Sequence, residues 1–184
     1  MNGLTPVIET ARQASGRAIP AWLRRFYEAF LLRDERELDA VLDERVDWLL
    51  EGPAEQFDHY GRRHGKRAVI ELITRIMPCY YQPAAFSLDC LLIQGDASHG
   101  NVATRIRMRA RQRDTGRALS LRSAQFIRFK GGLLTWFRAV PETFDAIEQM
   151  VGRSIDVSRA IETDPTVPRD LSLAPDGGAV DDER

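Results

Sequence analysis

Apolar side chains recur at helical spacing near the start of the chain. Between Trp22 and Leu31 they fall three or four positions apart, while charged side chains occupy the other side of the helix. Pro20 suits the first turn of such a helix, because the backbone N–H groups of a first turn have no helical partner. The pattern predicts a long amphipathic helix from about Pro20, followed by a shorter one that carries Leu38 and Val41.

The next elements are a strand, a loop and a third helix. A short apolar run at residues 46–50 predicts the strand, which Gly52 and the proline after it end. A loop is expected from there to about Gly65. Apolar positions from 69 to 77 then predict the helix, and we expect Pro78 to stop it, because proline lacks the backbone donor and clashes with the preceding turn.

The second half of the chain is patterned for strands. Long segments are separated by clusters of turn residues at 95–100, 114–116 and 130–132, which predict hairpins. Because the segments are long for strands, the sheet must twist and curl, which gives it a concave face. The last strand, at 133–140, leads into a helix that ends at Gly152. We predict an α+β fold in which a curled antiparallel sheet wraps three helices, with a fourth helix at the C-terminal end.

Composition divides the chain into three parts. Its 184 residues, 43% of them apolar, suit one domain, which we expect at residues 19–152. Within 153–184, the stretch from position 156 has eight acids against three arginines and no aromatic residue. It cannot bury enough apolar surface to offset its ordering entropy, so we expect a disordered acidic tail, with a partner-binding segment as the alternative. Residues 1–18 are expected to be loosely ordered.

Charge and hydropathy exclude several classes of protein. The net charge of −1 argues against a chain that binds nucleic acid through a general basic character. No apolar run approaches the roughly 20 residues of a membrane-spanning helix, and the first residues lack a secretory signal. We therefore expect a cytoplasmic protein without membrane contact, in which Cys79 and Cys90 are reduced thiols. The spacing of His, Cys and acidic residues predicts no metal site, and we expect no cofactor.

Five short segments together resemble a known family. They read VDW at 46–48, GRRHGK at 61–66, TGR at 115–117, FIRFKGG at 126–132 and ETFDAIEQ at 142–149. Their order and spacing are similar to those of the nuclear transport factor 2-like (NTF2-like) superfamily, and in particular of its SnoaL-like and ketosteroid-isomerase-like bacterial members. The resemblance covers residues 19–152 and implies a cone-shaped fold with an interior pocket. It implies no single reaction, because this fold carries enzymes and non-catalytic binders alike.

The catalytic residues of well-known enzymes of this fold are missing at the matching positions. Ketosteroid isomerases use a tyrosine on the first helix, a carboxylate base and a protonated aspartate, where this chain has Phe26, Gly52 and Gln125. Gln125 can donate a hydrogen bond but cannot transfer a proton at neutral pH. A shift of one residue would put Tyr27 in place of Phe26. Relatives that resemble limonene epoxide hydrolase need a strand aspartate, for which this chain has an arginine.

Polyketide-cyclase-like members need an apolar pocket and one acid/base group, for which Glu142 is the candidate by position. Its carboxylate either faces the pocket or merely meets the positive end of the last helix dipole. His64 and Tyr60 are the candidate hydrogen-bond partners, provided that their loop folds over the mouth of the pocket. For His59 and His64, the alternative is a position on the protein surface, because a histidine without a paired acid in the sequence is weak evidence for a functional site.

Large or polar side chains on the expected elements are candidates for the pocket wall, although aromatic residues at regular spacing usually pack in the core. The candidate ligand-binding residues are Trp22, Phe26, Phe30, Trp48, Asp89, Met108, Gln125 and Trp136. The expected partner is a small, mostly apolar molecule. As an enzyme, the protein would isomerise, cyclise or dehydrate it without a cofactor. The alternative is a non-catalytic module for binding a small ligand or for dimerisation.

Arginines occupy every second position from Arg105 to Arg113, so they share one face of a strand. A nucleic acid would need aromatic stacking partners on that face, and the intervening residues point away, which disfavours this partner. We expect the arginines to cover the convex face of the sheet, either in solvent or paired with acids across a homodimer interface. A rarer alternative turns Arg105 into the cavity to bind a carboxylate.

Overall fold

The computed structural model describes residues 7–10, 19–95 and 99–155 of the chain. Residue contacts divide the chain into one unit of Met1–Arg153 and a second of Ser154–Arg184. Every helix and strand below belongs to the first unit. The acidic tail expected from the sequence lies outside the described residues from position 156 onward. Within residues 1–18, the structure describes only strand β1 (Val7–Thr10).

The helices follow the apolar spacing of the sequence. They are α1 (Ala21–Leu32), α2 (Glu35–Val41), α3 (Lys66–Glu71), the π-helical turn η1 (Leu72–Ile76), α4 (Met77–Tyr80) and α5 (Thr143–Val151). The long first helix is confirmed, with Pro20 as its N-cap. The side chain of Asp34 caps α2 by accepting a hydrogen bond from the Glu37 amide. As predicted, α5 ends at Gly152, which takes a left-handed conformation with φ of 79°.

The prediction that Pro78 stops the third helix is wrong. Helical structure continues through the proline to Tyr80, and Pro78 lies in the first turn of α4. Just before it, the Met77 amide bonds to the Leu72 carbonyl, five residues back, in the wider turn η1. Proline is tolerated here because a first helical turn needs no donor at that position.

The strands form one seven-stranded sheet in the order β1-β4-β5-β6-β7-β2-β3. Besides β1, they are β2 (Leu42–Leu50), β3 (Gly61–His64), β4 (Tyr81–Gly95), β5 (His99–Gln112), β6 (Ala118–Lys130) and β7 (Leu133–Pro141). Strands β4 to β7 pair antiparallel, as predicted. The sheet is mixed, however, because β2 pairs parallel with β7 and β1 pairs parallel with β4. Strand β3 lies in the segment that was expected to be a loop.

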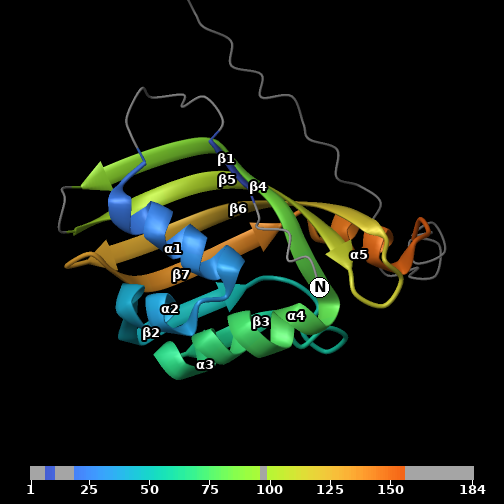
Figure 1. Cartoon of the computed structure of the whole chain (residues 1–184), viewed down its shortest axis with the longest axis horizontal. Helices are drawn as coiled ribbons and strands as arrows, with labels where there is room; N and C mark the ends of the chain where they lie inside the picture. Colours follow the sequence, from blue (N-terminus) through green and yellow to red (C-terminus); the bar gives the residue numbers. More distant parts are fainter. Residues whose placement is uncertain (1–6, 11–18, 96–98, 156–184) are drawn as a thin grey trace, which may run out of the picture. The chain divides into compact units, whose positions relative to one another are not determined.

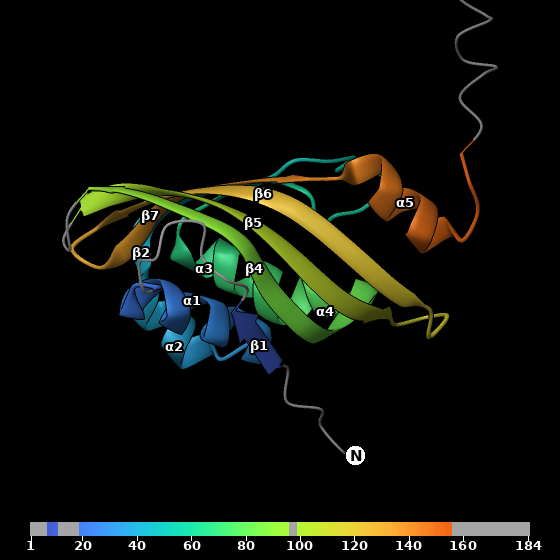
Figure 2. The same cartoon turned by 90° about the horizontal axis from the view of Figure 1, so that it is seen from above.

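Helices α1 to α4 lie against one face of the curled sheet, which we call the inner face (Figures 1 and 2). Register shifts in β4 and β6 mark bulges that help the long strands to bend. Helix α1 packs on the sheet through aromatic pairs: the rings of Phe26 and Phe137 on β7 are 6.1 Å apart, and those of Tyr27 and Phe86 on β4 are 4.8 Å apart. Helix α5 follows β7 and lies at one end of the sheet (Figure 2). The α+β fold expected from the sequence is confirmed.

The opposite face of the sheet, the outer face, carries the alternating arginines. Along β5, Ile106, Met108 and Ala110 are buried, while the arginines between them, from Arg105 to Arg111, are exposed. The alternation read from the sequence is therefore confirmed for Arg105 to Arg111, whereas Arg113 lies beyond the end of β5 and its Nε donates a hydrogen bond of 3.0 Å to the Pro78 carbonyl of α4.

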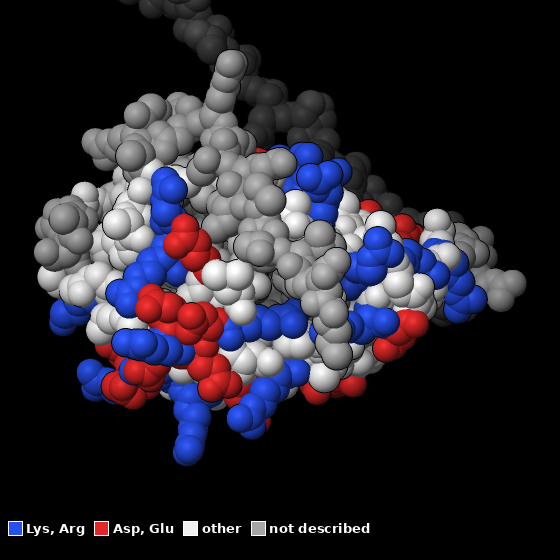
Figure 3. All heavy atoms as spheres, viewed as in Figure 1, with Lys and Arg blue, Asp and Glu red and all other residues white. Residues whose placement is uncertain are grey.

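The side of the molecule that carries the helices has acidic and basic side chains close together (Figure 3). Lys66, for example, lies within 3.2 Å of Asp39 and 2.6 Å of Glu44. Among the described residues, no helix is both long and apolar enough to cross a bilayer.

Candidate functional site

A narrow, mostly apolar pocket lies between the inner face of the sheet and the helices, and we call it the inner pocket. Its volume is about 80 Å³, and its walls come from α1, β2, the loop before β3, α4, strands β4 to β7 and α5. Three of the four methionines in the chain, Met77, Met108 and Met150, line it. The curl of the sheet brings these distant segments together around one cavity.

Gln125 on β6 supplies an amide group to this wall. The hydroxyl of Tyr27 donates a hydrogen bond of 2.6 Å to Gln125 Oε1. Tyr27 is almost fully buried, and burial raises the pKa of its phenol, so the donor stays protonated. Because Oε1 accepts this bond, Gln125 Nε2 is the atom that can donate to a ligand oxygen. The structure thus places Tyr27, and not Phe26, beside Gln125, which agrees with the one-residue shift.

His59 also lines the inner pocket and is only 2% exposed, so the surface position considered for it is wrong. Its ring centroid lies 4.3 Å from that of Tyr60, 4.4 Å from that of Tyr80 and 5.8 Å from that of Tyr81. Its Nδ1 atom is buried and has no hydrogen-bond partner among the described residues. Burial lowers the pKa of His59 to about 4, against the weaker opposite effect of Asp58, so the imidazole is neutral near pH 7.

The loop that carries His59 is held in place at both ends. The hydroxyl of Tyr80 donates a hydrogen bond of 2.7 Å to Asp58 Oδ1. At the start of the loop, the Tyr60 ring packs over Gly52 so closely that a Cβ atom on Gly52 would come within 2.7 Å of Tyr60 Cγ. Burial also raises the pKa of the Tyr60 phenol. The loop therefore presents a histidine and a protonated tyrosine to the pocket from a restrained backbone.

Five of the predicted site residues line the inner pocket. They are Tyr60, Phe30, Trp48, Met108 and Gln125. Trp48 is buried and stacks on Phe137, with ring centroids 3.7 Å apart and planes inclined by 9°. Each of these residues except Tyr60 lies on a regular element, where the spacing of neighbours already indicates the inward face.

Glu142 does not line the inner pocket. It precedes α5 as the N-cap residue, and its side chain makes no capping hydrogen bond. The side chain is 42% exposed, with Oε1 3.5 Å from Arg105 Nη2 and Oε2 3.2 Å from Arg122 Nη1. This placement corrects two expectations: Glu142 does not face the cavity, and Arg105 does not turn inward to bind a carboxylate. We therefore do not propose Glu142 as a proton carrier.

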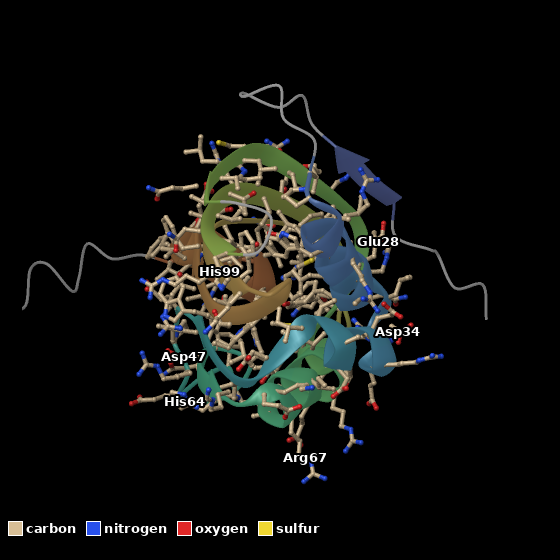
Figure 4. All side chains as sticks on the ribbon, turned by 90° about the vertical axis from the view of Figure 1, so that its left-hand side faces the viewer. Glu28, Asp34, Asp47, His64, Arg67 and His99 are labelled. Atoms are coloured by element: carbon tan, nitrogen blue, oxygen red, sulfur yellow. The ribbon has the colours of Figure 1, made fainter. Side chains whose placement is uncertain are left out.

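His64 lies on the edge strand β3, away from the inner pocket. Its side chain is 69% exposed, with Nδ1 3.5 Å from Asp47 Oδ1, and the two residues lie side by side at the sheet edge (Figure 4). Arg138 Nη2 lies 2.5 Å from Asp47 Oδ2, and this hydrogen bond is the main cause that lowers the pKa of Asp47. His64 thus belongs to an ion-pair group at the surface, which corrects its prediction as a pocket donor.

Phe26 is a core residue and Trp22 is partly buried against the core, and neither is part of the pocket wall. The Trp22 ring packs on Phe129 with centroids 4.3 Å apart. Phe26 is 1% exposed, and its ring contacts those of Trp48 and Phe137, which do line the inner pocket. Neither residue lines the inner pocket, so we do not propose them as ligand contacts.

Asp89 and Trp136 lie on the outer face. Asp89 falls at the bulge of β4, where alternation shifts, and its Oδ2 lies 3.5 Å from Arg107 Nη2. Trp136 is contacted by the guanidinium groups of Arg128 and Arg138, at 4.7 and 4.5 Å from the ring centroid. The prediction that these two side chains reach the interior ligand is not supported by their positions.

Sequence reasoning missed several residues of the wall. Besides His59, they include Tyr81 on β4 and Ala146 and Met150 on α5. A cluster of aromatic residues near one histidine, at positions 57–60 and 80–81, is the signal that could have indicated the His59 end. Nothing local could indicate the contribution of α5, because its place beside the sheet depends on how the last strand ends.

Cys79 and Cys90 are free thiols, as predicted. Within the described ranges, His, Cys, Asp and Glu side chains form no group of three or more that could hold a metal ion. The polar side chains that line the inner pocket are those of His59, Tyr60, Tyr81, Arg122, Ser123 and Gln125.

Comparisons with known proteins agree with this fold. The sequence profile of the SnoaL-like domain matches residues 23–137. The crystal structure of a candidate isomerase from Rhodopseudomonas palustris is 30% identical in sequence, with a TM-score of 0.64 over 74% of this chain and 100% of that chain. No protein of curated function matches the chain.

More distant structures share the fold alone. A limonene-epoxide-hydrolase-like (LEH-like) epoxide hydrolase from M. tuberculosis is 16% identical, with a TM-score of 0.54 over 72% of this chain and 89% of that chain. IdmH from Streptomyces antibioticus, a candidate polyketide cyclase, is 17% identical, with a TM-score of 0.56 over 71% of this chain and 96% of that chain. The two differ in their assigned chemistry, so the fold does not select a reaction.

Proposed function

Because the chain belongs to the SnoaL-like domain family, we propose that its inner pocket binds a small, mostly apolar molecule that carries a polar oxygen. The observation that carries this proposal is the apolar cavity with the Gln125 amide in its wall, oriented by the buried Tyr27 hydroxyl. A cavity needs roughly 10–15 Å³ to hold one water molecule, so about 80 Å³ suits a single small ring better than fused rings.

A catalytic role is the second proposal. The 30% identical candidate isomerase from Rhodopseudomonas palustris favours a cofactor-free isomerase, and cyclisation or dehydration would use the same kind of acid/base chemistry. Against it, none of the described residues that line the inner pocket is Asp or Glu. Gln125 cannot move a proton at neutral pH. We therefore propose binding as the first function. Catalysis requires a pocket residue other than Asp or Glu to carry the proton.

Binding can be tested with toluene and the methionine methyl groups. In wild-type protein labelled with ¹³C at the methionine methyls, toluene should shift the signals of Met77, Met108 and Met150, because all three line the pocket. Ala139→Leu should abolish these shifts, because Ala139 is buried in the wall and a larger side chain there fills the cavity. The measurement is a titration followed by methyl NMR spectra.

The matched control is Ala124→Leu. Ala124 is on β6, next to Gln125 in sequence, but its side chain points to the outer face and is half-buried. Toluene should bind this variant as it binds the wild type. Equal binding by the Ala139→Leu and Ala124→Leu variants, or an absence of binding by the wild type, would contradict the proposed pocket function.

We propose further that the outer face joins two copies of this chain. Leu92 and Phe126 are 57% and 45% exposed, and with Trp136 they line a groove of about 470 Å³. Beside the groove, the outer face carries both signs of charge, with Asp89 and Glu142 among the arginines. A two-fold axis sets one patch against its own copy, so a face with apolar residues and both charges can be self-complementary.

Phe126→Asp should convert the dimer into a monomer. The added carboxylate would be buried against apolar surface of the second copy, which should weaken association at least roughly 30-fold, as for a central interface residue. Size-exclusion chromatography with light scattering measures the mass at micromolar concentration. Leu32→Asp is the control, because Leu32 is 57% exposed at the end of α1, on the helical side of the sheet. A monomeric wild type would overturn this proposal.

A further inference from the structure

The wall of the inner pocket contains a histidine, His59, whose buried Nδ1 atom makes no hydrogen bond within the described part of the chain, and the Nε1 atom of Trp48 in the same wall is likewise buried and unpaired there. His59 is 98% removed from solvent, lines the cavity, and has a buried Nδ1 without a partner among the described residues. Buried polar atoms in proteins nearly always have a hydrogen-bond partner, because leaving one unpaired is costly. An unpaired imidazole in a cavity wall therefore indicates a partner that enters the cavity.

The surroundings of His59 are aromatic. The rings of Phe57, Tyr60, Tyr80 and Tyr81 all lie within 6.0 Å of the imidazole, centroid to centroid. The nearest carboxylate, on Asp58, is engaged by the Tyr80 hydroxyl and not by the imidazole. Within the described part of the chain, His59 forms no ion pair, so a neutral ligand group suits it better than an ionic one.

We propose that His59 is the group that recognises the polar end of the ligand, and that the ligand is a single aromatic or enolic ring bearing a hydroxyl group. This inference rests on the proposed binding function of the inner pocket. The aromatic side chains around His59 would contact the faces and edges of such a ring. His59 would hydrogen-bond the hydroxyl.

A hydroxyl fits His59 better than other small polar groups do. A neutral imidazole has one nitrogen that donates and one that accepts, and which is which depends on the tautomer. A hydroxyl can donate to the bare nitrogen or accept from the protonated one, so it satisfies either tautomer. A ketone accepts only, and would leave one tautomer unpaired. The cavity of about 80 Å³ limits the ligand to about one ring.

Phenol and toluene are the two probes for this test, because they differ only by a hydroxyl in place of a methyl group. We expect the ratio of phenol affinity to toluene affinity to fall roughly tenfold in His59→Phe, since one neutral hydrogen bond is lost. Phenylalanine retains a flat ring among the aromatic neighbours, and thermal melts would show that the variant folds. His64→Phe is the matched control, because His64 is exposed on β3, and there the ratio should not change.

A second measurement uses the unmodified protein. The chain has three histidines, so the ring ¹⁵N signals of His59 can be assigned by elimination, as those that remain in both His64→Phe and His99→Phe. Phenol should move the ¹⁵N signals of His59, and toluene should leave them nearly unchanged. This readout holds even where His59→Phe fails to fold.

The outcomes separate the two proposals. If neither probe binds, the pocket function fails and the role of His59 fails with it. If both bind, but the affinity ratio is unchanged in His59→Phe and phenol does not move the His59 ¹⁵N signals, the pocket function stands and the recognition of a hydroxyl by His59 is overturned.

Discussion

Gly52→Ala is expected to destabilise the protein by about 3 kcal/mol, because it combines backbone strain with overpacking. Gly52 has φ of 154°, a region that side-chain-bearing residues rarely adopt. A methyl group there would also collide with the ring of Tyr60, which is 4% exposed and packed on His59, so the ring has little room to move. Chemical unfolding in guanidinium chloride measures the change.

Gly116→Ala is the matched control for this substitution. Gly116 also has a positive φ, of 68°, but nothing lies within 4 Å of the position that its Cβ would take. Gly116→Ala should lower the free energy of unfolding by about 1 kcal/mol, because only the backbone conformation becomes less favourable. If the two variants lose the same stability, the contact between Gly52 and Tyr60 is not what excludes a side chain at position 52.

This contact also explains the missing isomerase carboxylate. By resemblance, position 52 is where ketosteroid isomerases carry their base, and here the Tyr60 ring fills the space that a side chain would need. Gly52→Asp should therefore not restore that chemistry, since the carboxylate has nowhere to go. His59 and Tyr60 line the inner pocket, and Gly52 does not.

Phe26→Ala is expected to lower the free energy of unfolding by about 4 kcal/mol, in the range for removing a fully buried aromatic ring. Phe26 is 1% exposed, and its ring is within 6.2 Å of those of Tyr27, Phe30, Trp48 and Phe137. The ring joins α1 to β2 and β7, so the cavity left behind cannot close without moving the helix. Guanidinium chloride unfolding, followed by tryptophan fluorescence, measures the loss.

Phe144→Ala is the control, with the same change at an exposed site on α5. The Phe144 side chain is 50% exposed, so its loss should change stability by no more than about 0.5 kcal/mol. A Phe26→Ala variant as stable as Phe144→Ala would show that Phe26 does not join the helix to the sheet.

Much of the fold could be predicted from the sequence, because each element's periodicity is a local property. The apolar spacing of α1, the Gly152 end of α5 and the alternation along β5 all appear in the structure where the sequence places them. Two departures have causes that the spacing of apolar residues does not show. Pro78 continues a helix because a π-helical turn precedes it, and β3 forms because the edge of β2 offers it hydrogen bonds.

The candidate site was less predictable than the fold. Phe30, Trp48, Met108 and Gln125 could be assigned to the interior, because alternation or helical spacing turns them toward the concave face. Glu142 could not be assigned correctly, because at the junction of β7 and α5 no periodicity indicates a direction. Its side chain turns to the outer face, where two arginines attract it.

The order of apolar and polar residues along this chain settles which elements form and which side of each is buried, since those depend on near neighbours. It also places the arginines of β5 on one face. Which groups meet in the inner pocket depends on the assembled sheet, because His59, Gln125 and Met150 come from a loop, a strand and a helix far apart in sequence. Whether His59 is charged depends likewise on burial, which its neighbours in space impose and its neighbours in sequence do not.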